Sequence, residues 1–81
     1  MKVYTKGNRT AVVTTYAAAS AAVRAAWANG RGSTFYADRT AGLIENDAGE
    51  VIAHVSFNGR VWQGDKRLSS GNVEIDVRGA A

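Results

Sequence analysis

Short apolar runs separated by polar turn residues occur between Leu43 and Gln63, which is typical of strands joined by hairpin loops. Three runs share this character: Leu43–Asn46, Val51–Phe57 and Arg60–Gln63. Gly49 suits the left-handed position of a three-residue hairpin loop between the first two runs. Between the second and third runs, Asn58-Gly59 favours a two-residue type I′ turn, because both residues tolerate positive φ angles. The pattern therefore predicts a β-meander.

A two-residue turn at Asn58-Gly59 determines which side chains share a face, because successive strand residues point to opposite sides. It pairs Val55 with Trp62 and His54 with Gln63. One face then carries Val51, Ala53, Val55, Phe57 and Trp62. The opposite face carries Ile44, Ile52, His54, Ser56, Val61 and Gln63. We expect a helix to cover the first face, and the second face either to be solvated or to contact a second copy or a partner.

An Ala-rich run from Thr15 to Asn29 predicts the helix, since alanine has the highest helix propensity. Four residues recur at helical spacing and should pack on the sheet: Tyr16, Ser20, Val23 and Trp27. Thr14 or Thr15 suits the N-cap, because a threonine hydroxyl accepts a hydrogen bond from a free amide of the first turn. Asn29-Gly30 is a suitable C-terminal end.

Four further segments have strand character: Lys2–Thr5, Thr10–Val13, Ser33–Ala37 and Val73–Val77. The segment Thr10–Val13 either joins the sheet or runs directly into the helix. Val73–Val77 alternates cleanly, as a half-buried strand does. Together the segments predict an α+β fold, with one Ala-rich helix packed on a mostly antiparallel sheet of four to five strands.

The length of 81 residues predicts one domain over residues 1–81, with a thin core. Leu, Ile, Val and Phe number 16, which is near the low end for a folded chain, whereas 15 alanines favour a compact fold. A thin core gives marginal stability, which a homodimer would increase by covering a second apolar face. We expect such a dimer, or a second partner face, to use Ile44, Ile52, His54 and Val61.

The absence of cysteine excludes disulfides and thiolate zinc sites, and it fits a reducing cytoplasm. The N-terminal residues Met1–Lys6 lack the apolar run of a signal peptide. The stretch Ala17–Ala28 is too short to span a bilayer and contains Arg24. We therefore expect a cytoplasmic protein that does not enter a membrane.

Positive charge is concentrated in the first half of the chain. Residues 1–44 carry six basic side chains against Asp38, whereas residues 45–81 carry four bases and six acids. The basic half would suit an acidic protein or nucleic acid, or would simply be solvated. Our candidates for partner contacts are Arg9, Arg24, Arg31 and Arg39. Nearby aromatic residues would either stack on bases or complete the small core: Tyr4, Phe35 and Tyr36.

No catalytic, metal or cofactor site is predicted. His54 is the only histidine, and general acid–base catalysis requires a second titratable group within reach, which no spacing supplies. One histidine and scattered carboxylates do not complete a metal coordination shell. The segment Gly30–Thr34 follows a helix instead of opening one, so it lacks the helix N-terminus of a phosphate loop. We therefore expect a non-enzymatic protein.

The opening residues Met1–Arg9 and the stretch Gly49–Trp62, in a short chain without proline or cysteine, resemble those of small phage-encoded anti-CRISPR proteins. The resemblance points to inhibitors of type I, possibly type I-C, effector complexes. It implies a non-enzymatic inhibitor, acting in the cytoplasm of an infected bacterium, that binds an effector subunit and blocks target-DNA engagement.

Many such inhibitors are acidic and mimic DNA, whereas this chain has a net charge of +3. We therefore expect it to bind an acidic protein patch rather than to imitate nucleic acid. The alternative is a small basic phage regulator that binds nucleic acid directly.

Overall fold

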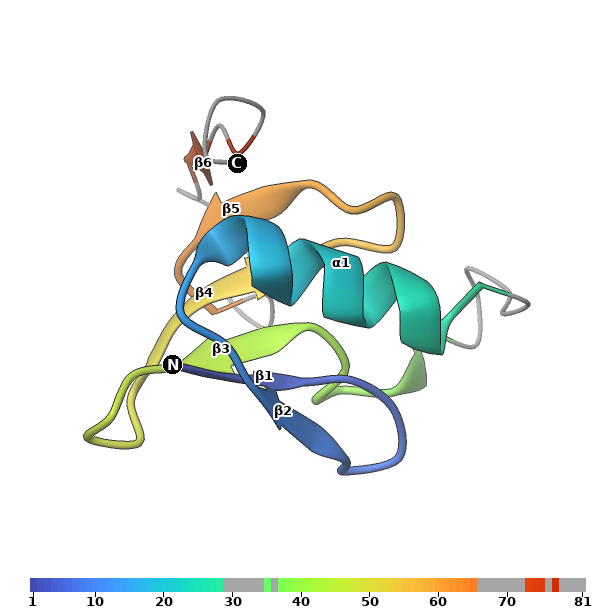
Figure 1. Cartoon of the computed structure of the whole chain (residues 1–81), viewed down its shortest axis with the longest axis horizontal. Coiled ribbons are helices and arrows are strands. Elements are labelled where there is room, and N and C mark those ends of the chain that lie inside the picture. The colour runs from blue at the N-terminus through green and yellow to red at the C-terminus, as the bar shows by residue number, and fades with distance from the viewer. Residues whose placement is uncertain (29–34, 36, 66–72, 76, 78–81) are drawn as a thin grey trace.

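One helix packs on a six-stranded antiparallel sheet in the computed structural model, which describes residues 1–28, 35, 37–65, 73–75 and 77 (Figure 1). The elements are β1 (Lys2–Tyr4), β2 (Thr10–Val12), α1 (Tyr16–Ala26), β3 (Leu43–Glu45), β4 (Val51–Val55), β5 (Val61–Gln63) and β6 (Glu74–Ile75). The strand order is β2-β1-β3-β4-β5-β6, and every pairing is antiparallel. The predicted α+β class is confirmed. The sheet has more strands than predicted, in part because Thr10–Val12 joins it as an edge strand.

Helix α1 begins where the sequence predicts. The Thr15 backbone is extended, and its hydroxyl oxygen accepts a hydrogen bond from the Ala18 amide at 3.0 Å, as an N-cap residue does. Ser20, Val23 and Trp27 are buried, so the predicted stripe is confirmed for these residues. The helix ends at Ala26, with Trp27 as its C-cap. The C-terminal end predicted at Asn29-Gly30 lies outside the described residues.

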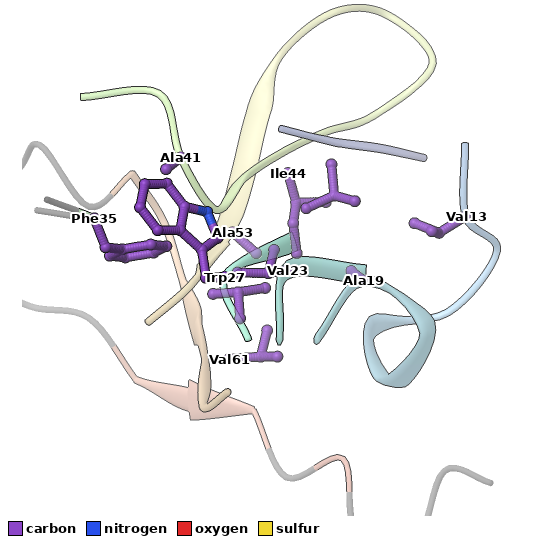
Figure 2. Packing of buried hydrophobic residues seen from close by; sticks show 11 residues of the cluster. Val13, Ala19, Val23, Trp27, Phe35, Ala41, Ile44, Ala53 and Val61 are labelled. Carbon is purple, nitrogen blue, oxygen red and sulfur yellow. The ribbon is translucent and has the colours of Figure 1, made fainter. Parts of the chain in front are cut away.

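The core lies between α1 and the sheet face that it covers. Figure 2 shows Val23 close to Ile44 and Val61, with the rings of Trp27 and Phe35 at one end and Val13 at the other. The centroids of the Trp27 and Phe35 rings are 5.2 Å apart in an edge-to-face arrangement. Edge-to-face pairs are favourable because the positive ring edge meets the negative ring face. The aromatic side of the core thus joins the end of α1 to Phe35.

The predicted pairing of β4 with β5 is wrong by one residue. Val55 pairs with Val61 and His54 with Trp62. The connection is a three-residue loop, Phe57 to Gly59, closed by the Ser56 amide donating to the Arg60 carbonyl at 2.7 Å. Only Gly59 has a positive φ, +88°, so Asn58 does not adopt the type I′ geometry. A shift of one residue moves every β5 side chain to the other face.

A β-bulge changes the face of Ile44. Ile44 pairs with Ala53 and Glu45 with Val51, so Ile52 is the extra residue on β4. The three-residue loop that ends in Gly49 is present as predicted. Without the bulge, that loop would place Ile44 opposite Ile52. With it, the Ile44 side chain joins the helix-covered face.

These two differences separate the residues of the predicted dimer face. Ile44 and Val61 are fully buried in the core under α1. Ile52 is half-buried, and His54 lies on the other face, next to its cross-strand neighbours Leu43 and Trp62. The prediction that all four residues share one exposed face is therefore wrong.

Two predicted strands differ from the structure. Of the range 33–37, Phe35 and Ala37 are helical rather than extended, and the other residues lie outside the described part. Strand β6 contains Glu74–Ile75, a shorter segment than predicted. No helix among the described residues combines the length and apolar character needed to cross a bilayer.

Candidate partner-binding surface

Two turns meet at the end of the molecule where α1 terminates, and they bring together Lys6, Arg9 and Arg39; we call these three residues the basic end. Lys6 and Arg9 lie on the turn between β1 and β2, and Arg39 lies on the segment before β3 (Figure 1). Both arginines are exposed, and neither forms an ion pair with another described residue. The basic end therefore presents two guanidinium groups to solvent, neither paired with an acid in the described part of the chain.

Asp38 holds the two turns of the basic end together. Its carboxylate accepts a hydrogen bond from the Gly7 amide at 3.3 Å, across 31 residues of sequence. The same carboxylate accepts bonds from the Thr40 amide and hydroxyl at 3.1 and 3.0 Å. Asn8, at φ +66°, has its side-chain oxygen 3.4 Å from the Thr40 hydroxyl. These contacts position Arg9 and Arg39 at the same end of the fold.

Trp27 anchors the β1–β2 turn to the end of the helix. The indole N–H donates to the Thr5 carbonyl at 2.6 Å. The Lys6 ammonium lies 4.9 Å from the centroid of the Trp27 ring, which is a cation–π distance. A cation beside the C-terminus of a helix is also favoured by the helix dipole. The positive charge of Lys6 is thus fixed against a buried side chain.

The hydrogen bonds to Asp38 predict a pH effect. Partial burial by itself raises the pKa of the Asp38 carboxyl. The bonds from the Thr40 hydroxyl and from the Thr40, Gly7 and Ala41 amides outweigh it and hold the pKa below its ordinary value of 3.8. The charged form therefore stabilises the fold above that pH, and this contribution disappears as the pH falls through the lower, folded pKa.

We expect Asp38→Asn to reduce the free energy of unfolding at pH 7 by less than about 1 kcal/mol, because the carboxyl is only partly buried and solvent screens its charge. Urea unfolding of both proteins between pH 7 and pH 2 checks this. The difference in the free energy of unfolding between wild type and variant should shrink below about pH 4. A constant difference across that range would contradict the assigned role of the carboxylate.

Arg24 occupies a different surface, beside the loop that joins β4 to β5. The Ser20 hydroxyl donates to the Gly59 carbonyl at 2.6 Å, which docks this loop on α1. Arg24 is exposed and lies against Gly59. Arg60, on the same loop, forms an ion pair with Glu74 at 3.6 Å. Of the four predicted contact residues, the structure therefore brings together Arg9 and Arg39, places Arg24 elsewhere, and leaves Arg31 outside the described residues.

His54 is nearly buried on the sheet face that α1 does not cover. Its Nδ1 lies 2.8 Å from the Gly64 carbonyl oxygen, which can only accept, so Nδ1 carries the proton. The contact is with backbone and not with a second titratable group. No group of three or more potential metal-ligating side chains gathers in the described ranges.

The aromatic residues beside the basic end already have structural roles. Phe35 is fully buried. Tyr4 is half-buried, and its hydroxyl donates to Glu45 at 3.0 Å. These rings complete the packing instead of forming an open stacking platform, whereas Tyr36 lies outside the described residues.

The predicted contact residues include neither Lys6, which lies at the basic end, nor Arg60, which lies on the surface beside Arg24. The positive charge of Lys6 is evident from the sequence, but nothing local indicates that Trp27 lies under the Lys6 ammonium. The comparisons with known proteins assign no relative: no family model, curated protein or solved structure matches the chain.

Proposed function

We propose that this protein is a non-enzymatic inhibitor of a type I CRISPR-Cas surveillance complex, which binds an effector subunit and blocks target-DNA engagement. The class of target comes from the resemblance of Met1–Arg9 and Gly49–Trp62 to anti-CRISPR proteins. The basic end supports a binding role, because it is a preformed positive surface at one end of a small domain.

The basic end would bind an acidic patch of the effector. Arg9 and Arg39 are exposed without an ion-pair partner in the described ranges, so binding would not require an internal salt bridge to break. Asp38 and Trp27 hold the two turns in place before binding, which limits the entropy lost on association. Complementary charge would steer the encounter and orient the docked inhibitor. A domain docked in this way would obstruct the path of the target DNA sterically.

The test is a gel-shift assay with a guide-loaded type I-C effector and labelled target DNA, in which the protein is added before the DNA. We expect the wild type to prevent formation of the effector–DNA complex. The Arg9→Gln/Arg39→Gln variant should require about tenfold more protein for the same effect, because two exposed charges each contribute up to about 1 kcal/mol.

The matched control is Thr14→Glu/Ala48→Glu, which lowers the net charge by the same amount at exposed positions. These positions lie before α1 and on the β3–β4 loop, at the end of the molecule away from the basic end (Figure 1). The control should inhibit like wild type. An equal loss of inhibition in both variants would mean that only the net charge matters. An intact effector–DNA complex in the presence of wild type would contradict the proposed block of DNA engagement.

The second candidate function is direct binding of nucleic acid, which the exposed arginines of the basic end would also suit. The packed state of Tyr4 and Phe35 favours the protein-directed function, because these rings are not available for base stacking. A lane with the protein and labelled DNA alone separates the two functions. A shifted DNA band in that lane that weakens steeply with added salt would support direct nucleic-acid binding in place of the proposed function.

A further inference from the structure

A hollow of about 410 Å³ lies between α1 and the β4–β5 loop and extends to β6. Arg24, Asn58 and Arg60 line it together with Glu74, Ile75 and Val77. A second hollow, of about 590 Å³, lies along the helix beside Phe57. Arg24 and Asn58 line both hollows.

The stem of Arg24 lies against Gly59 of the β4–β5 loop. A Cβ at position 59 would lie 2.6 Å from the Arg24 Cδ, so the Arg24 stem packs directly against the glycine backbone. The Ser20 hydroxyl bond to the Gly59 carbonyl fixes the same contact from the helix. The Arg24 guanidinium thus extends from a stem that lies against the docked loop, and it has no ion-pair partner among the described residues.

The polar groups around this hollow are mostly donors. The Asn58 side-chain oxygen already accepts bonds from the Ser56 hydroxyl and the Arg60 amide, which leaves the amide N–H groups of Asn58 for a ligand. Arg60 forms an ion pair with Glu74 in this lining, so the described lining carries one net positive charge, that of Arg24. One net positive charge balances a single carboxylate, whereas a run of phosphates would bring several negative charges beside Glu74. Ile75 and Val77 add apolar contact area beside it.

We propose that this hollow binds one Asp or Glu side chain of the protein partner, flanked by an aliphatic residue, with Arg24 as the principal carboxylate ligand. The identity of that partner as an effector subunit rests on the proposed function. The chemistry of the hollow can be measured without the effector. Arginine suits this role because its planar guanidinium binds a carboxylate through two parallel hydrogen bonds.

The experiment is an NMR titration of the labelled protein with acetyl-Leu-Glu-Leu-amide. We expect saturable shifts of the Arg24 Nε–H and the Gly59 amide. Acetyl-Leu-Gln-Leu-amide should bind at least tenfold more weakly, because it lacks the charge. Arg24→Gln should weaken the Glu peptide to the same extent, and Arg24→Lys should bind more weakly than wild type because it cannot form the two parallel bonds.

The matched control is Lys2→Gln, which removes one positive charge from a residue that lines neither hollow. It should bind the Glu peptide like wild type. Unchanged backbone amide spectra outside the hollow verify that each variant is folded. Equal binding by Arg24→Gln and wild type, no saturable shift at all, or stronger shifts with inorganic phosphate than with the Glu peptide would each overturn the inference.

The effector assay separates this inference from the proposed function. If the protein binds the Glu peptide through Arg24 but does not inhibit the effector, the inference about the hollow is supported and the proposed function is contradicted. If the protein inhibits the effector but does not bind the Glu peptide, the proposed function is supported and the inference about the hollow is contradicted. If both hold, Arg24→Gln should weaken inhibition about tenfold or more, as expected for loss of a charge-assisted hydrogen bond.

Discussion

Gly42→Ala should leave the protein largely unfolded at 25 °C. The glycine has φ +87°, and a Cβ at this position would lie 2.2 Å from the Val55 carbonyl oxygen and 3.2 Å from the Phe35 ring. The Val55 oxygen is backbone within the sheet, so it cannot rotate away as a side chain would. The Gly42 amide donates to Tyr4, and its carbonyl accepts from Val55, both at 2.8 Å. The extra methyl group would therefore separate β3 from its neighbours.

The expected loss in the free energy of unfolding for Gly42→Ala exceeds the total stability of a domain of this size. The positive φ alone costs an alanine about 1 kcal/mol. Each displaced backbone hydrogen bond adds about 1 kcal/mol, with a further cost for the opened core. A core in a chain of about 80 residues supplies only about 3–5 kcal/mol in total.

Gly49→Ala is the matched control for Gly42→Ala. Gly49 has a similar φ, +82°, but nothing lies within 4 Å of a Cβ there. Urea unfolding followed by circular dichroism should therefore show a loss of only about 1 kcal/mol for Gly49→Ala. Similar losses in the two variants would mean that the close approach of Val55 to Gly42 is not a constraint on the fold.

Phe35→Ala should lower the free energy of unfolding by about 3–5 kcal/mol, the range for truncation of a buried aromatic residue. Phe35 is fully buried, and its ring contacts Trp27 and Phe57 edge to face, with centroid distances of 5.2 and 5.8 Å. Its removal would leave a cavity between the end of α1 and the β4–β5 loop. The basic end lies where α1 terminates, and the hollow beside Arg24 lies at the β4–β5 loop, so both surfaces adjoin this part of the core.

Chemical denaturation monitored by tryptophan fluorescence measures the loss at Phe35. Phe35→Leu retains part of the volume and should lose less, so it provides a measurable intermediate if the alanine variant does not fold. Val12→Ala is the control, because Val12 is 87% exposed and should change stability by less than about 0.5 kcal/mol. A loss at Phe35 no larger than at Val12 would contradict the assigned core.

The helix and its buried stripe were predictable from the sequence, because both depend on local chemistry. Alanine propensity, the Thr15 cap and the spacing of Ser20, Val23 and Trp27 all act within a few residues. The same is true of the Gly49 loop and of the strand character of Val51–Val55. The last turn of the helix was less predictable, since helix ends depend on what packs against them.

The register of the sheet was not predictable from local signals. Asn58-Gly59 suits two turn types, and the structure has the three-residue loop, in which Gly59 contacts Ser20 and Arg24 of the helix. The bulge at Ile52 likewise moves Ile44 into the core. A choice between two pairings that differ by one residue depends on burial across the whole sheet, because each shift exchanges the two faces.

The α+β class, the helix, the meander and the excess of basic residues in the first half could all be read from the amino-acid sequence. Which residues share a surface depended on the folded arrangement of distant segments. Lys6 and Arg9 meet Arg39 because Asp38 accepts a bond from Gly7 across 31 residues of chain, and Arg24 lies beside Arg60 because the hairpin loop docks on α1. Local propensities act over a few residues, whereas such surfaces depend on contacts between distant segments, which form only when the core is packed.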